Sequence, residues 1–146
     1  MTRNRPSANA VILRRSDDLP EEDAYTVWLA AAGAPPVGDP ERKLPHLARR
    51  LEEAFDASRD TWLRLARDMG AEPTGELSHA AAAGAFGSDF GLMLAWSRLV
   101  ATAEPGLLAI CDDPWLFRHL AALPNVRAGN APPLFAAAMK LRLRGF

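Results

Sequence analysis

Two adjacent aspartates, Asp112 and Asp113, are the residues of this chain best placed to do chemistry together. They follow the apolar run 107–111, and a continuous apolar run of that length is typical of a strand covered on both faces. In open parallel sheets, ligands bind beyond the carboxyl ends of the strands. Carboxylates at such an end could bind a ribose hydroxyl, a metal ion or a sugar. Both aspartates are therefore candidate catalytic residues.

The same pair also has a purely structural interpretation. An aspartate followed by proline is typical of a helix start, with Asp113 as the N-cap and Pro114 in the first turn. Asp112 would then lie in solvent or pair with a cation. Two carboxylates would also repel a phosphate group beside them. The sequence leaves both interpretations open.

Two further side chains near the pair could take part in catalysis. His119 lies four residues after Trp115, on the same face of the expected helix, and could reach back towards the aspartates as an acid or base. A surface or core histidine is the alternative. Cys111 is the only cysteine; a helix N-terminus lowers a thiol pKa, but adjacent aspartates oppose the thiolate. At the end of a buried strand, cysteine is most often a small apolar residue.

Motifs for cofactors and metals are missing from the sequence. One cysteine cannot build a zinc site, and the three histidines show no metal-ligand spacing. No dinucleotide, mononucleotide or nucleophile-elbow glycine motif occurs. We expect no cofactor and no structural metal.

The apolar pattern predicts the elements that must position these residues. We expect strands at 10–13, 107–111 and 125–127, helices at 21–32, 47–70, 90–103 and 114–123, and a proline-rich loop at 34–45. Strand, helix and strand between 107 and 127 form a βαβ unit. The sequence therefore predicts an α/β fold: a helix-rich, three-layer, Rossmann-like domain with a small parallel sheet.

The expected helix 90–103 is apolar nearly all round, which is typical of a helix buried between other elements. Ser88 and Asp89 before it have the residue types of an N-terminal cap. Arg98 interrupts the apolar sequence, and a buried arginine needs a carboxylate, a phosphate or an exposed path for its head group. Asp89 or the 112–113 pair could supply the carboxylate.

Composition limits the class of protein. The chain has 146 residues, 49% apolar and 24% charged, with a net charge of −1, which fits one globular domain without a general attraction to nucleic acid. No apolar stretch is long enough to span a membrane, and the one at 10–13 is too short for a secretion signal. We expect a cytoplasmic domain. Near the end, 134–139 has a helical pattern and 140–144 alternates like a strand. We expect either that the chain is a piece of a longer protein or that its terminus docks on a partner.

Two stretches, 88–99 and 108–119, together resemble a segment of bacterial surface-carbohydrate biosynthesis proteins, which look like glycosyltransferases built from two Rossmann-like halves. The resemblance implies that the chain is the amino-terminal, acceptor-side half and that a further C-terminal domain is needed for transfer. It implies a sugar or nucleotide-sugar ligand. Ser88, Arg98 and Trp115 are the candidate ligand-binding residues within these stretches.

Two other functions fit the same residues. A non-enzymatic interaction module would use the apolar helix 90–103 or the C-terminus to bind a protein partner. A small standalone enzyme would use Asp112, Asp113 and His119 as its polar set. Fold alone does not choose among the three.

Overall fold

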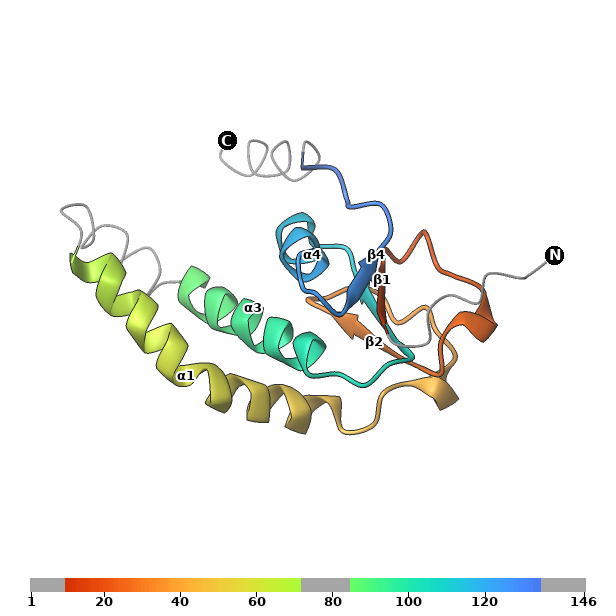
Figure 1. Cartoon of the computed structure of the whole chain (residues 1–146), viewed down its shortest axis with the longest axis horizontal. Helices are drawn as coiled ribbons and strands as arrows, with labels where there is room; N and C mark the ends of the chain where they lie inside the picture. The colour runs from red at the N-terminus through yellow and green to blue at the C-terminus, as the bar shows by residue number, and fades with distance from the viewer. Residues whose placement is uncertain (1–9, 72–84, 135–146) are drawn as a thin grey trace. The chain divides into compact units, whose positions relative to one another are not determined.

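The computed structural model describes the backbone of residues 10–71 and 85–134 and most of their side chains. Contacts divide the chain into two compact units, one formed by Met1–Pro45 with Val100–Phe146 and the other by His46–Leu99. Figure 1 shows the helices and strands along the chain. In the described part of the chain, no helix is long and apolar enough to cross a membrane.

The first unit contains a parallel sheet in the order β2-β3-β1-β4. Its strands are β1 (Val11–Arg14), β2 (Val27–Ala31), β3 (Leu107–Cys111) and β4 (Val126–Ala128). All five residues of β3 are buried, as its unbroken apolar sequence predicts. The α/β class with a small parallel sheet is therefore confirmed. The predicted βαβ unit is present, with β1 lying between β3 and β4.

The prediction of a helix at 21–32 is wrong. The acidic residues form one turn, η1 (Glu22–Ala24), and the apolar residues that follow form β2, paired with β3 along its whole length. Val27 and Trp28 favour an extended chain, and pairing with a buried strand satisfies the backbone of β2. Gly33 ends a strand instead of a helix: Ala32 and Gly33 both have positive φ, 48° and 77°.

One face of the sheet is covered by the connections on either side of β2. Tyr25, Trp28, Leu108 and Ile110 form a buried cluster with Ala34. The Trp28 indole N–H donates to the carbonyl of Asp39 at 2.6 Å. The predicted loop, which contains the single turn η2 (Pro40–Arg42), therefore folds back over this face.

The opposite face of the sheet is covered by α4 (Pro114–Ala121), which contacts β1, β3 and β4. Its residues Leu116, Phe117 and Leu120 are buried. Strand side chains alternate between the two faces. The positions between the members of the Trp28 cluster, such as Leu13 and Ala109, are also fully buried. Both faces of this sheet are therefore enclosed.

The second unit consists of α1 (Leu47–Ala71) and most of α3 (Ala85–Ala101). The helix predicted at 47–70 is confirmed, but its apolar side chains are only partly buried. Ala54 and Ser58 are buried, whereas Phe55 is 43% exposed. A Cβ added at Gly91 of α3 would lie 2.8 Å from the Phe55 ring, so the absence of a side chain there lets the two helices approach closely.

Two expectations for the second unit are wrong. Helix α3 begins at Ala85, so Ser88 and Asp89 lie inside it and do not cap its N-terminus. The helix also has an exposed side, which includes Arg98, so this arginine is not the buried cation that the apolar sequence around it suggested. The predictions for 140–144 and most of 134–139 concern residues outside the described part of the chain.

Candidate functional site

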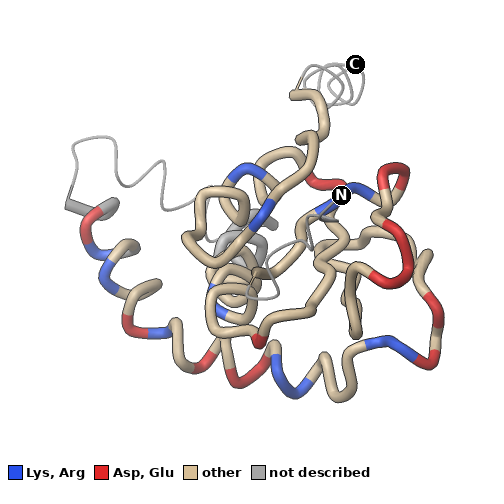
Figure 2. Tube along the Cα trace, turned by 45° about the vertical axis from the view of Figure 1, so that its right-hand side comes forward, with Lys and Arg blue, Asp and Glu red and all other residues tan. Residues whose placement is uncertain are grey.

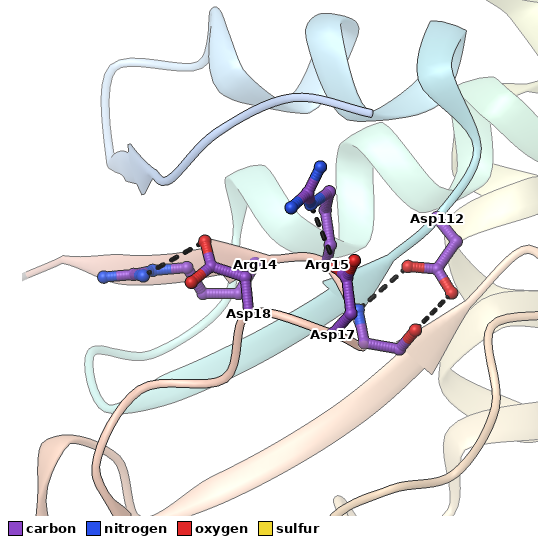
Figure 3. A network of polar contacts seen from close by, with 6 residues as sticks. Arg14, Arg15, Asp17, Asp18 and Asp112 are labelled. Atoms are coloured by element: carbon purple, nitrogen blue, oxygen red, sulfur yellow. Dashed lines mark hydrogen bonds and ion pairs between the residues drawn. The ribbon is translucent and has the colours of Figure 1, made fainter. Parts of the chain in front are cut away.

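The carboxyl ends of three neighbouring strands lie at one edge of the sheet, because all of its strands are parallel. The loop 15–18 follows β1, Asp112 follows β3, and the positive-φ turn at Ala32 and Gly33 follows β2. We call the residues 14–18, 112 and 113 the polar edge. Two of the three loops carry charged side chains, as Figure 3 shows.

Connections from β1 and β3 leave the polar edge in opposite directions. The chain after β1 runs to β2 at one side of the sheet, and Ala24 and Tyr25 of this connection pack against Ile110 and Leu108. The chain after β3 forms α4 on the opposite face and runs to β4 at the other side. Adjacent strand ends whose connections leave on opposite faces are the usual place for a ligand in an open parallel sheet.

Asp112 is held at this edge by a residue far away in the sequence. Its Oδ1 accepts a hydrogen bond from the backbone N–H of Ser16 at 2.8 Å, and its Oδ2 accepts one from the Ser16 hydroxyl at 2.6 Å. The aspartate is exposed. Since each carboxylate oxygen has two lone pairs, both oxygens can still accept a hydrogen bond from a ligand in a fixed orientation.

Asp113 has the structural role that its position before proline suggested. Its Oδ1 accepts from the backbone N–H groups of Trp115 at 3.0 Å and Leu116 at 2.7 Å. This is the N-cap of α4, with Pro114 in the first turn, and it satisfies two N–H groups that have no partner inside the helix. Of the two candidate carboxylates, the geometry leaves Asp112 the better placed to meet a ligand.

Two arginines at the polar edge are paired within their own loop. Arg15 Nε lies 3.0 Å from Asp17 Oδ1, and Arg14 Nη1 lies 3.5 Å from Asp18 Oδ2, as drawn in Figure 3. Gly129, just after β4, leaves room for the Arg14 side chain: an added Cβ would lie 2.7 Å from its Cδ. The Arg14 side chain of the polar edge therefore reaches the chain just after β4.

The charge around the edge is predominantly negative. Besides Asp112 and Asp113, the edge carries Asp17 and Asp18, so its carboxylates outnumber Arg14 and Arg15; Figure 2 marks the acidic segments of the chain in red. The two arginines are paired with two of these carboxylates. Such a surface disfavours anionic ligands such as phosphates and favours neutral or cationic ones.

The thiol of Cys111 is unsuited to nucleophilic catalysis. Cys111 is fully buried in β3, and burial raises its pKa to about 12. The nearby carboxylates of Asp113 and Asp112 add to the shift, while the contact with the Asp113 carbonyl opposes it. At neutral pH the thiol stays protonated, and only the thiolate is an effective nucleophile.

The other predicted site residues do not all gather at this edge. Trp115 lies in the first turn of α4 and is 60% exposed. His119 is exposed one turn further on, and in the described structure it makes no hydrogen bond to either aspartate. Arg98 and Ser88 belong to α3 in the other compact unit, and the Ser88 side chain is outside the described part.

No metal centre is formed by the described side chains: no group of three or more histidine, cysteine, aspartate or glutamate residues among them could hold an ion.

Comparisons with known proteins do not identify the function of the site. No family model, curated protein or solved structure matches this chain. The resemblance to surface-carbohydrate biosynthesis proteins therefore stays a prediction.

The sequence did not point to Ser16 and Arg14 of the polar edge, nor to Gly129 beside it. Ser16 is separated from Asp112 by 96 positions, so no local spacing connects them. A signal was nevertheless present: 10–13 was expected to be a strand in the same parallel sheet as 107–111. The residues following both strands could have been placed at a shared edge.

Proposed function

We propose that this chain is the acceptor-side half of a glycosyltransferase-like protein of bacterial surface-carbohydrate biosynthesis, and that its polar edge binds the hydroxyl groups of an acceptor sugar. The observation that carries the proposal is the exposed Asp112 carboxylate, fixed by Ser16 at the carboxyl end of a central parallel strand. A carboxylate held in this way accepts hydrogen bonds from sugar hydroxyls without first having to be ordered.

The negative charge of the polar edge favours binding of a neutral acceptor sugar over binding of a nucleotide-sugar donor. Nucleotide sugars carry a pyrophosphate, which the carboxylates of Asp17, Asp18, Asp112 and Asp113 would repel. A neutral sugar has no such penalty. Trp115, exposed in the first turn of α4, supplies an apolar ring of the kind that packs against the C–H face of a sugar and keeps its polar N–H for a partner.

In this proposal Asp112 has a catalytic role as well as a binding role. A carboxylate that accepts a hydrogen bond from the acceptor hydroxyl can take its proton as the hydroxyl oxygen bonds to the anomeric carbon of the donor sugar and the nucleoside diphosphate leaves with the electron pair of the broken bond. The donor would be held by the C-terminal half that the resemblance implies. This chain alone is then expected to bind acceptors without completing the transfer.

Saturation-transfer NMR on the whole chain tests the proposal. The ligands are the methyl glycosides of glucose, galactose, mannose and N-acetylglucosamine, with uridine diphosphate glucose as the anionic comparison. We expect saturation of at least one neutral glycoside. Asp112→Asn removes the carboxylate that accepts hydrogen bonds from the glycoside and should weaken glycoside binding by about tenfold. Asp60→Asn, an exposed change on α1, should not weaken it.

Two results would contradict this function. Either none of the four neutral glycosides receives saturation, or the glycoside that binds does so equally well with Asp112→Asn. Preferential binding of the nucleotide sugar would also overturn the assignment to the acceptor side. Trp115→Ala gives a second test, since removal of the indole should weaken glycoside binding and leave the Ser16–Asp112 contact in place.

A further inference from the structure

Helices α1 and α3 form a groove in the second compact unit, well separated in sequence from the polar edge. Its volume is about 470 Å³, and it is lined by Ala48, Leu51, Glu52, Phe55, Asp56 and Leu92. Phe55 is 43% and Leu92 38% exposed. A groove of this size with an apolar floor can take several side chains of another segment.

The charges that line the groove are both negative. Glu52 and Asp56 lie one turn apart on α1 and are exposed. Arg59 approaches Asp56 from the next turn, at 3.4 Å between Nη2 and Oδ1, but does not line the groove. An apolar floor beside two carboxylates is complementary to an apolar segment that carries cations.

This chain contains a segment with that chemistry at 134–144. It has five large apolar residues and three cations and no acidic residue: Leu134, Phe135, Met139, Leu141, Leu143, Lys140, Arg142 and Arg144. Its alternation of leucine with arginine or lysine at 140–144 would let apolar and cationic side chains reach different surfaces. The composition of the segment matches the groove in both hydrophobicity and sign of charge.

We propose that the α1–α3 groove binds segment 134–144 of a second copy of this chain, so that two copies exchange these segments reciprocally. Leucine side chains of the segment would cover Phe55 and Leu92, and its cations would pair with Glu52 and Asp56. An exchange of identical elements gives a closed dimer with two equivalent contacts. The proposal does not depend on the function of the polar edge.

Sedimentation velocity of the whole chain, over a wide range of concentrations, tests the dimer. We expect a concentration-dependent dimer whose dissociation constant rises at high salt, because screening weakens the pairs with Glu52 and Asp56. Leu92→Glu in the groove should raise the dissociation constant at least about tenfold. Leu63→Glu is the matched control, since Leu63 is 46% exposed on α1 and does not line the groove.

A charge exchange distinguishes the proposed contact from a general effect on folding. Glu52→Arg with Asp56→Arg should abolish the dimer, as should Arg142→Glu with Arg144→Glu. A mixture of the two double variants should restore both contacts, one with the natural charges and one with the charges reversed. A chain that is monomeric at every concentration would overturn the proposal. So would an equal effect of Leu63→Glu, or failure of the mixed variants to associate.

Discussion

Both carboxylate oxygens of Asp112 accept hydrogen bonds from Ser16, one from its backbone N–H and one from its hydroxyl. The pair joins the loop after β1 to the loop after β3 across 96 positions of sequence. Because the two strands are neighbours in the sheet, the contact fixes the ends of both strands against each other. It is the feature from which the candidate site is built.

The contact between Ser16 and Asp112 should contribute measurably to folding. Ser16→Ala removes the hydroxyl donor and should lower the free energy of unfolding by about 1 kcal/mol. In urea titrations, a double-mutant cycle with Asp112→Ala should give a coupling energy of about 0.5–1.5 kcal/mol. Thr61→Ala, an exposed change on α1, is the control. Additive effects of the two changes would mean that the hydrogen bond from the Ser16 hydroxyl contributes nothing.

Removal of the N-cap of α4 should destabilise the first unit without affecting the candidate carboxylate. Asp113→Ala leaves the N–H groups of Trp115 and Leu116 without their acceptor, which should cost about 1 kcal/mol. Asp113→Asn keeps an oxygen in the same place and should cost less. Urea titration of both variants checks this, and equal losses would show that the cap has no specific role.

A side chain at position 38 should disturb the packing of Trp28. A Cβ added to Gly38 would lie 2.5 Å from the Trp28 indole, which is too close for any atom pair. Gly38→Ala should therefore destabilise the chain by about 1–3 kcal/mol and change its near-ultraviolet circular dichroism. Val37→Ala, at an exposed position of the same loop, should have a small effect. A Gly38→Ala variant as stable as the natural chain would contradict this packing.

The buried thiol should make stability depend on alkaline pH. Burial raises the pKa of Cys111 from 9.0 to about 12, so between these values the unfolded chain loses the proton and the folded chain keeps it. The free energy of unfolding should fall as the pH rises above 9, by about 1.4 kcal/mol per unit at most from this group. Cys111→Ala should remove that part of the slope.

Urea titrations at pH 8 and pH 10 measure the difference. At pH 8 the native thiol should also resist aromatic disulfide reagents, since it is fully buried and protonated, and should react once the chain is unfolded. The predicted environment of the thiol would be contradicted if the free energy of unfolding changed equally with pH in the natural chain and in Cys111→Ala. Rapid reaction of the folded protein with the disulfide reagent would also contradict it.

Local signals were enough to predict β3, the cap of α4 and the course of α1. The apolar run 107–111, the Asp113-Pro114 pair and the periodicity of 47–70 each determine their own element. The strand β2 was missed because its acidic approach resembles a helix start, while pairing with β3, 80 residues later, decides its conformation. Asp112 was identified from the end of its strand, but Ser16 was not, since only the folded sheet brings the two together.

The order of the strands has a consequence for how the chain is made. Each ladder of the sheet joins β1 or β2 to β3 or β4, and none joins β1 to β2. During synthesis the first hundred residues therefore leave the ribosome with both early strands lacking a partner. Neither strand can form its ladder with β3 until residue 107 emerges. Nascent chains arrested before and after that point should differ sharply in resistance to proteases.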